Sequence, residues 1–225
     1  MSAPPPAPSR SVSPRQAVKR LAEQAGRPTE PVYATNVNAP RQIAVSGAEA
    51  AVDRLLTLAR THGATRAERL AVNVPAHSLL MAGPERELAA VLSGLPVAPP
   101  RVPFAGNHDG RTLRTADAVR QDLIRSIARP VRWHEATSVL YERGVRLFVQ
   151  VWPGDSLTRL AQTAFPDARA TSMRATSPEH ILQLVRRVPP RSSVGPQSED
   201  RRHHHREATR DPPPGTATMT AQRNG

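Results

Sequence analysis

The feature that most limits what this chain can fold into is the uneven distribution of its prolines. Residues 1–31 hold seven of the 24 prolines, and residues 189–225 hold six more. Segments this rich in proline and polar residues bury too little apolar surface to offset the entropy of folding, so both ends are expected to be mostly disordered. A short helix over Pro14–Ala25 fits the pattern but is marginal alone. A core therefore has to be built from Val32–Arg187.

Short strands alternate with helices in this middle part. Residues 32–75 have a β-β-α-β pattern, which predicts a small ferredoxin-like subdomain. The spacing of Ser46 and Glu49 is that of a capping box, which would start the helix of this unit. Thr115 is expected to cap another helix that ends before Pro130. Over 76–188 the alternation predicts a parallel α/β sheet, with the apolar run Val145–Val151 as its central strand.

Composition excludes several classes of protein. The chain has no cysteine, so disulfides, thiolate metal sites and a cysteine nucleophile are excluded. It has no apolar run of about 18 residues, which a membrane-spanning helix needs. The first residues also lack the apolar stretch of a secretory signal, so a cytoplasmic protein is expected.

The formal net charge of +12 invites a nucleic-acid interpretation. Against it, the cations are almost all arginine, with Lys19 the only lysine, and they are scattered among acidic residues. Aromatic residues that could stack on bases make up 3% of the chain. Nucleic-acid binding is therefore kept only as an alternative that rests on charge.

Three motifs resemble malonyl-CoA:acyl-carrier-protein transacylases. They are NVNAPRQIAVSG at 36–47, LAVNVPAHSLLMAGPERELAAVL at 70–92, and DLIRSIARPVRWHEATSVLYERGVRLFVQVWPGDSLTRL at 122–160. Within that family, the phrases RWHEA, YERGVRL and PGDSLT resemble the epsilon subunit of malonate decarboxylase. The resemblance implies the C-terminal part of the acyltransferase fold, which is α/β and similar to α/β-hydrolases, with the ferredoxin-like subdomain inserted.

The resemblance also implies an activity and a set of site residues. Malonyl would pass from malonyl-CoA to a serine and then to the phosphopantetheine thiol of an acyl carrier protein, with no bound cofactor or metal. His77 stands where the family has the base that activates the serine. The backbone carbonyl of Ser126 would orient that histidine, and Asn36, Asn38 and Gln42 would border the substrate cleft.

The family's serine lies on a G-H-S-x-G elbow, and no G-x-S-x-G occurs in these 225 residues. Neither Ser78 nor Ser156 has that context. The expectation is therefore that a serine outside this chain, for example in a separately encoded N-terminal half, is the nucleophile. The alternative is an inactive remnant that only docks a carrier protein. The run His203–His205 is interpreted as part of the disordered tail rather than as a metal site.

Overall fold

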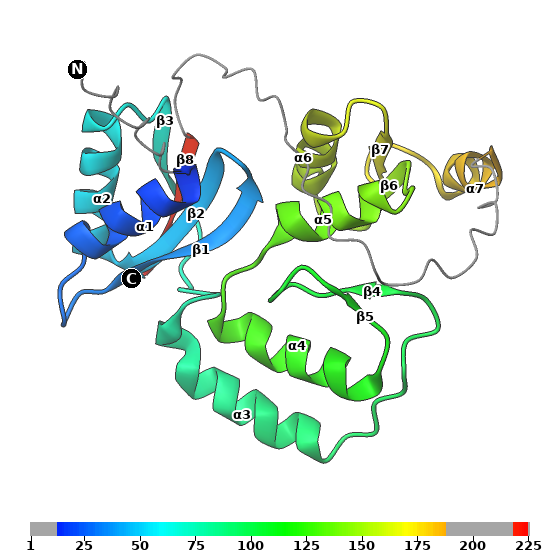
Figure 1. Ribbon diagram of the computed structural model, residues 1–225, viewed down its shortest axis with the longest axis horizontal. Helices are drawn as coiled ribbons and strands as arrows, with labels where there is room; N and C mark the ends of the chain where they lie inside the picture. Colours follow the sequence, from blue (N-terminus) through cyan, green and yellow to red (C-terminus); the bar gives the residue numbers. More distant parts are fainter. Residues whose placement is uncertain (1–12, 188–217, 225) are drawn as a thin grey trace, which may run out of the picture.

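The computed structural model describes residues 13–187 and 218–224 (Figure 1). The helices are α1 Pro14–Ala25, α2 Glu49–Thr61, the short 3₁₀ helix η1 Leu79–Met81, α3 Ala82–Ser93, α4 Ala116–Ala128, α5 Trp133–Glu142, α6 Ser156–Ala164 and α7 Pro178–Arg187. The strands are β1 Val32–Ala39, β2 Gln42–Ala48, β3 Arg66–Leu70, β4 Phe104–Ala105, β5 Thr112–Leu113, β6 Leu147–Gln150, β7 Arg169–Ser172 and β8 Thr218–Asn224.

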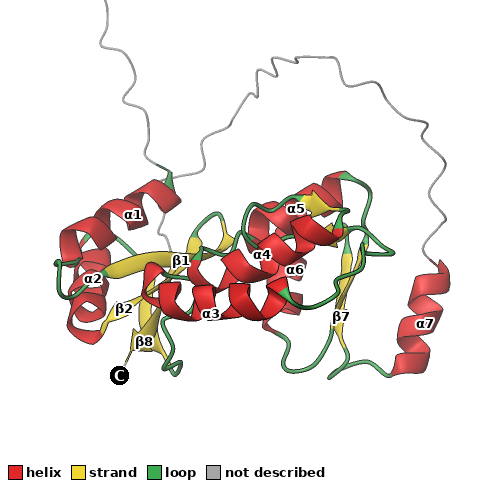
Figure 2. Cartoon of the chain, turned by 90° about the horizontal axis from the view of Figure 1, so that it is seen from below, coloured by secondary structure: helices red, strands yellow, loops and turns green. Residues whose placement is uncertain are grey.

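The largest sheet in the described part has the strand order β1-β2-β8-β3. Strands β1 and β2 form an antiparallel hairpin, and β8 runs parallel to both of its neighbours, β2 and β3. Helices α1 and α2 cover one face of this sheet, at the end of the molecule opposite α7 (Figures 1 and 2). The ferredoxin-like interpretation of residues 32–75 stays a prediction, because α1 and β8, which complete this unit, lie outside that range.

The main hydrophobic core lies between this sheet and its two helices. It consists of buried apolar side chains from α1, β1, β2 and α2, namely Val18, Ala22, Ala25, Val32, Ile43, Val45, Ala51, Val52, Leu55, Leu56 and Ala59. Helix α1 starts with a capping box, in which the Ser13 hydroxyl accepts from the Gln16 amide and the Gln16 side chain accepts from the Ser13 amide. Packing against α2 stabilises a helix that would be marginal alone.

Both predicted disordered ends are partly folded. Within the leader at 1–31, the helix predicted over Pro14–Ala25 is confirmed as α1, and its apolar face is buried in the core. The prediction of a disordered tail at 189–225 is wrong for residues 218–224, which form β8 between β2 and β3. Composition misses the strand at 218–224 because its pairing partners are distant in sequence. The His203–His205 run lies outside the described residues.

The capping box predicted at Ser46 and Glu49 is also wrong. The N-cap of α2 is Ala48, which makes no side-chain cap hydrogen bond. Ser46 is instead a fully buried residue of β2, and its hydroxyl donates to the Ala76 carbonyl oxygen at 3.3 Å. Residue 47 must be glycine, because a Cβ there would lie 2.3 Å from the carbonyl oxygen of Pro31.

The remaining elements lie beside this sheet (Figure 1). Helix α3 packs against α4, and the parallel pair β6–β7 packs against α6. In the described part β6 pairs with β7 alone and is only partly buried, so the prediction of a central strand at Val145–Val151 is wrong. Phe165 stacks on Tyr141 and Phe148 to form a small aromatic cluster here. Thr115 caps α4 as predicted, accepting from the Ala118 amide.

Candidate functional site

His77 is bound to the C-terminal turn of α4 by two hydrogen bonds. Its backbone amide donates to the Ile127 carbonyl oxygen at 2.8 Å. Its ring nitrogen Nδ1 lies 2.5 Å from the Ser126 carbonyl oxygen. A carbonyl can only accept, so Nδ1 carries the proton, and the lone pair of the neutral ring is on Nε2. The structure thus brings His77 and Ser126 together through the main chain of Ser126.

Pro130 explains why these carbonyls are available. In a continuous helix, the Ser126 carbonyl would accept from the amide of residue 130, but proline has no N–H. The Ile127 carbonyl would accept from Val131, whose amide donates instead to Thr35 of β1 at 2.8 Å. Both carbonyls at the end of α4 are therefore left without helical partners, and His77 supplies a donor to each.

The loop that carries His77 is fixed on its other side as well. Ser46, which lies in β2, donates its hydroxyl hydrogen bond to the carbonyl oxygen of Ala76 in this loop. His77 itself has a φ of 63°, an unusual backbone angle for a residue that is not glycine. The buried Ser78 hydroxyl donates to the Pro75 carbonyl oxygen at 2.7 Å and caps η1. Ser78 is therefore a turn-forming residue, consistent with its exclusion as a nucleophile.

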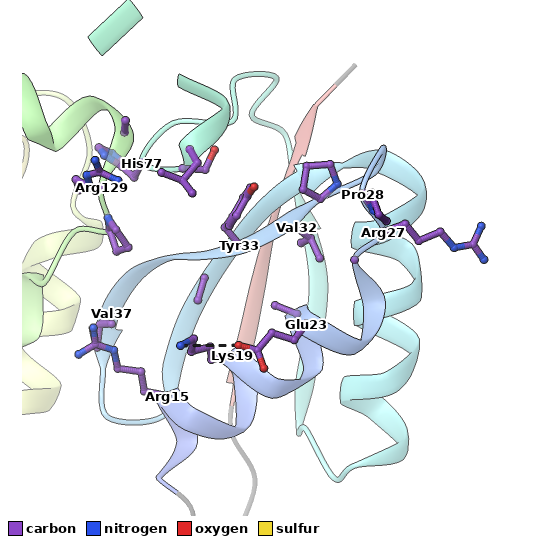
Figure 3. A pocket seen from close by; sticks show the side chains of 18 residues that line it. Arg15, Lys19, Glu23, Arg27, Pro28, Val32, Tyr33, Val37, His77 and Arg129 are labelled. Atoms are coloured by element: carbon purple, nitrogen blue, oxygen red, sulfur yellow. Dashed lines mark ion pairs between the residues drawn. The ribbon is translucent and has the colours of Figure 1, made fainter. Parts of the chain in front are cut away.

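A cavity of about 690 Å³ lies beside His77, between α1, β1 and the end of α4 (Figure 3). The residues that line it are Arg15, Lys19, Ala22, Glu23, Gly26, Arg27, Pro28, Pro31, Val32, Tyr33, Ala34, Val37, His77, Ser78, Leu79, Ala128, Arg129 and Pro130. Its walls are mostly apolar, and His77 is the only histidine among them. A small molecule of this size could lie against the imidazole.

The charged residues around the cavity are predominantly basic. Arg15 and Lys19 extend from α1, and Arg129 lies on the opposite side near His77 (Figure 3). Lys19 forms an ion pair with Glu23 at 3.8 Å, and Arg15 pairs with Glu135 of α5 at 3.0 Å. With Arg27, the residues that line the cavity include four cationic side chains and one carboxylate. The local field therefore favours an anionic ligand.

The predicted cleft residues Asn36, Asn38 and Gln42 do not line this cavity, and their place at a substrate cleft stays a prediction. The part of β1 that does line it includes Tyr33 and Val37. The β1–β2 pairing has irregularities between Ala34 and Asn36 and between Val37 and Ala39. Strand alternation alone could not have located these irregularities.

Asp122 is a positioning residue that sequence reasoning missed. Its carboxylate is 5% exposed and accepts from the Asn107 and His108 amides, each at 3.0 Å. The Asn107 carbonyl in turn accepts from Arg132, next to Val131. Asp122 thereby fixes α4, whose last turn holds His77. The sequence did contain a sign of this role, because Asp122 is an acidic residue on the otherwise apolar stripe of α4.

The signature PGDSLT forms the turn between β6 and α6. The Gln150 side chain accepts from both the amide and the hydroxyl of Thr158, at 2.8 and 3.1 Å. Trp152 is 66% exposed, and Arg159 pairs with Asp155 on the surface of α6. Trp152 and Arg159 therefore both lie at the surface. Ser156 is exposed and lies in the first turn of α6.

No group of three or more histidine or acidic side chains in residues 13–187 and 218–224 could hold a metal ion. None of the described helices is both long and apolar enough to cross a membrane.

Burial lowers the pKa of His134 in α5, and Glu135 beside it partly opposes this effect.

Comparison with known proteins identifies a family. A family profile described as "Acyl transferase domain" matches residues 9–194. The malonyl CoA-acyl carrier protein transacylase of Haemophilus influenzae is 35% identical over 144 residues, which is 64% of this chain and 46% of that protein. The protein of the same name from Escherichia coli K12 is 32% identical over 146 residues, or 65% of this chain and 47% of that protein.

Solved structures give the same picture. The malonyl CoA-acyl carrier protein transacylase of Coxiella burnetii superimposes with a TM-score of 0.70 at 30% identity, covering 77% of this chain and 54% of that one. A malonyl-transacylase solved in complex with its type II PKS acyl-carrier protein has a TM-score of 0.66 at 32% identity, covering 71% and 52%. The chain thus spans about half the length of the relatives it matches.

Proposed function

The chain belongs to the acyl transferase domain family, and we propose that it supplies the base-bearing part of an acyl-carrier-protein S-malonyltransferase. The observation that carries the proposal is the contact between Nδ1 of His77 and the Ser126 carbonyl oxygen at 2.5 Å. This contact leaves Nε2 as the proton acceptor on a residue that lines a cavity. A serine hydroxyl needs such an acceptor, because it is a weak nucleophile at its own pKa.

The proposed reaction has two balanced steps. In the first, the serine oxygen attacks the thioester carbon of malonyl-CoA, and the carbon–sulfur bond breaks. Nε2 of His77 takes the serine proton and delivers it to the departing thiolate of coenzyme A. In the second, the sulfur of the phosphopantetheine thiol of a carrier protein attacks the ester carbon, and the bond between that carbon and the serine oxygen breaks. Nε2 takes the thiol proton and delivers it to the serine oxygen.

The basic cavity supports the choice of substrate. Malonyl-CoA carries a carboxylate and several phosphates, and the acceptor arm carries one phosphate. Arg129 lies close to His77, while Arg15 and Lys19 extend from α1 on the other side (Figure 3). Several cations around a partly apolar cavity suit a ligand that combines an acyl chain with anionic groups.

The serine itself has to come from outside these residues. No G-x-S-x-G is present in the chain. We therefore propose that the nucleophile belongs to a complementary segment, such as a separately encoded N-terminal half. The cavity beside His77 is where its hydroxyl would have to lie. The ferredoxin-like subdomain of the family would correspond to α1, the largest sheet and α2.

The acceptor in this proposal is the carrier subunit of malonate decarboxylase. Support for that subtype comes from the phrases RWHEA, YERGVRL and PGDSLT. The relatives described above are instead named for transfer to acyl carrier protein. Parallel assays with a malonate decarboxylase carrier and a fatty-acid carrier separate the two branches, and the higher kcat/KM identifies the acceptor.

Transfer of labelled malonyl from malonyl-CoA to a phosphopantetheinylated carrier protein tests the activity. The chain is combined with the segment of the Haemophilus influenzae relative that it does not match. We expect transfer only when both are present, and His77→Ala is expected to lower the rate by roughly 10²–10⁴-fold. His62→Ala, at an exposed histidine that ends α2, is the matched control and leaves the rate unchanged. Equal rates for the two variants would contradict the role of His77.

A second candidate function is carrier-protein docking without transfer. The same basic residues around the cavity and the lack of an elbow serine favour it. This alternative would be selected if the chain, combined with the complementary segment, still bound the carrier protein but formed no malonyl-serine. Binding of nucleic acid, the third candidate, is supported by net charge alone.

A further inference from the structure

Arg15 forms an ion pair with a residue far away in the sequence. Its Nη1 lies 3.0 Å from Oε1 of Glu135, 120 residues later, in α5. Arg15 lines the cavity beside His77, whereas Glu135 lines a second cavity and not this one. The two side chains are 42% and 38% exposed. A pair this open to water contributes little to stability, so Arg15 can change partner at little cost.

Glu135 keeps a partner when Arg15 leaves. Its other oxygen, Oε2, lies 3.5 Å from Nε of Arg132. That distance is longer than a normal hydrogen bond, and Oε2 is a buried atom that makes no hydrogen bond within the described residues. One carboxylate is thus shared between two arginines and bonds closely to only one of them. Release of Arg15 lets this carboxylate turn toward Arg132, so that its charge is not left unpaired.

Arg15 and Lys19 lie one turn apart on α1. Residues at i and i+4 share a face of a helix, and both of these side chains line the cavity, across from His77 (Figure 3). The helix itself is fixed, because its apolar face is buried in the core. Lys19 pairs with Glu23 at 3.8 Å, and both of these side chains are mostly exposed. The fold therefore places two weakly held cations on the side of the cavity away from His77.

We propose that Arg15 and Lys19 form a subsite for the phosphate of a phosphopantetheine arm, and that Arg15 enters this subsite by leaving Glu135. In the proposed function, on which this rests, the thiol of the arm reaches His77. Donor and acceptor share the chemistry, because coenzyme A and a carrier protein both attach pantetheine through a phosphate at the same position. The arm has its sulfur at one end and its phosphate at the other, so the two ends need subsites on opposite sides of a cavity.

A phosphate competes well with Glu135 for Arg15. The planar guanidinium can donate two parallel hydrogen bonds to a phosphate. Toward Glu135, the structure gives it a hydrogen bond from Nη1 alone. Lys19 adds a second cation on the phosphate side, and Glu135 retains Arg132. The arm therefore draws Arg15 into the cavity, and Arg15 returns to Glu135 when the arm leaves.

Binding of phosphopantetheine and of pantetheine to the chain alone tests the subsite without any transfer. The two compounds differ only in the phosphate, and isothermal titration calorimetry gives a Kd for each. We expect phosphopantetheine to bind about tenfold more tightly or better, and Arg15→Ala or Lys19→Ala to reduce this ratio about threefold or more. Arg20→Ala is the matched control, because it removes an exposed charge from α1 outside the cavity lining. Equal affinities in the parent chain, no binding of either compound, or an equal effect of Arg20→Ala would overturn the subsite.

The change of partner by Arg15 has a readout of its own. Glu135→Gln removes the competing carboxylate, so this variant should bind phosphopantetheine about threefold more tightly or better, with pantetheine unchanged. Glu142→Gln removes the same charge from an exposed position of α5 and should change neither affinity. Unchanged or weaker binding of phosphopantetheine by Glu135→Gln would mean that Arg15 does not have to leave this carboxylate, and would overturn the exchange. Equal tightening by Glu142→Gln would do the same.

Steady-state kinetics of the chain combined with the complementary segment separates donor from acceptor. Arg15→Ala should raise KM for malonyl-CoA and for the carrier protein by similar factors, with kcat nearly unchanged, because both substrates carry the phosphate. A rise confined to one of them would overturn a shared subsite. Phosphate-dependent binding without transfer would count against the proposed function alone, and transfer without phosphate-dependent binding would count against the subsite alone.

Discussion

Replacing the Asp122 carboxylate should destabilise the fold more than any exposed charge on the same helix. Asp122 is 5% exposed, and its two oxygens accept from the amides of Asn107 and His108 at 3.0 Å. Asp122→Ala leaves both amides without their acceptor, at roughly 1.5 kcal/mol each, so the free energy of unfolding should fall by about 3 kcal/mol. The small space left beside Gly106 adds to this loss.

Asp117→Ala is the matched control, because it removes a carboxylate from the first turn of the same helix. Its side chain is 89% exposed and pairs with Arg120. Exposed pairs of this kind contribute about 0.5 kcal/mol or less. Urea unfolding followed by circular dichroism measures both variants against the parent chain, with equal m-values as the check on two-state behaviour. A loss for Asp122→Ala no larger than that for Asp117→Ala would refute the assigned role of the buried carboxylate.

Two further predictions concern backbone space and pH. Gly47→Ala places a Cβ 2.3 Å from the Pro31 carbonyl oxygen, so it should destabilise by about 3 kcal/mol or more in urea unfolding. Gly83→Ala in α3, with no atom within 4 Å, should instead stabilise by roughly 0.5–1 kcal/mol; equal effects would contradict the close approach. Burial lowers the pKa of His134, so the unfolded chain binds its proton first as pH falls. Stability should therefore decrease below about pH 6.5, and His134→Gln should weaken this dependence; an unchanged slope would argue against it.

Local signals in the sequence predict local structure here. The Thr115 cap, the helix over Pro14–Ala25 and the first two strands of the β-β-α-β pattern depend on neighbouring residues, and the structure has all of them. Ser46 shows where this reasoning fails. Its spacing to Glu49 fits a cap, yet its hydroxyl has a partner 30 residues away. Tertiary contact overrides the local pattern at this position.

Contacts between distant residues explain the other differences. Residues 218–224 have the composition of a tail, but they pair with a strand about 170 residues earlier in the sequence. The bulges between β1 and β2 likewise depend on the pairing of two strands rather than on either one.

The site could be predicted only in part from the residues. Nothing in the pattern around His77 identifies a partner 49 residues away, and the family resemblance supplied that expectation. Pro130 was a usable physical signal, because a proline four residues after Ser126 leaves that carbonyl free. The basic residues of α1 at the cavity could not be foreseen, because the helix pattern over Pro14–Ala25 does not show what the helix packs against.

The protonation state of the His77 ring tests the central claim most directly. Long-range ¹H–¹⁵N correlation spectra of the uniformly labelled chain distinguish the two neutral tautomers, and the His77→Gln variant assigns the signals. The account predicts that neutral His77 carries its proton on Nδ1, donated to the Ser126 carbonyl, with the lone pair on Nε2. A proton found on Nε2, or rapid averaging between the two nitrogens, would contradict it and remove the acceptor that the proposed transfer requires.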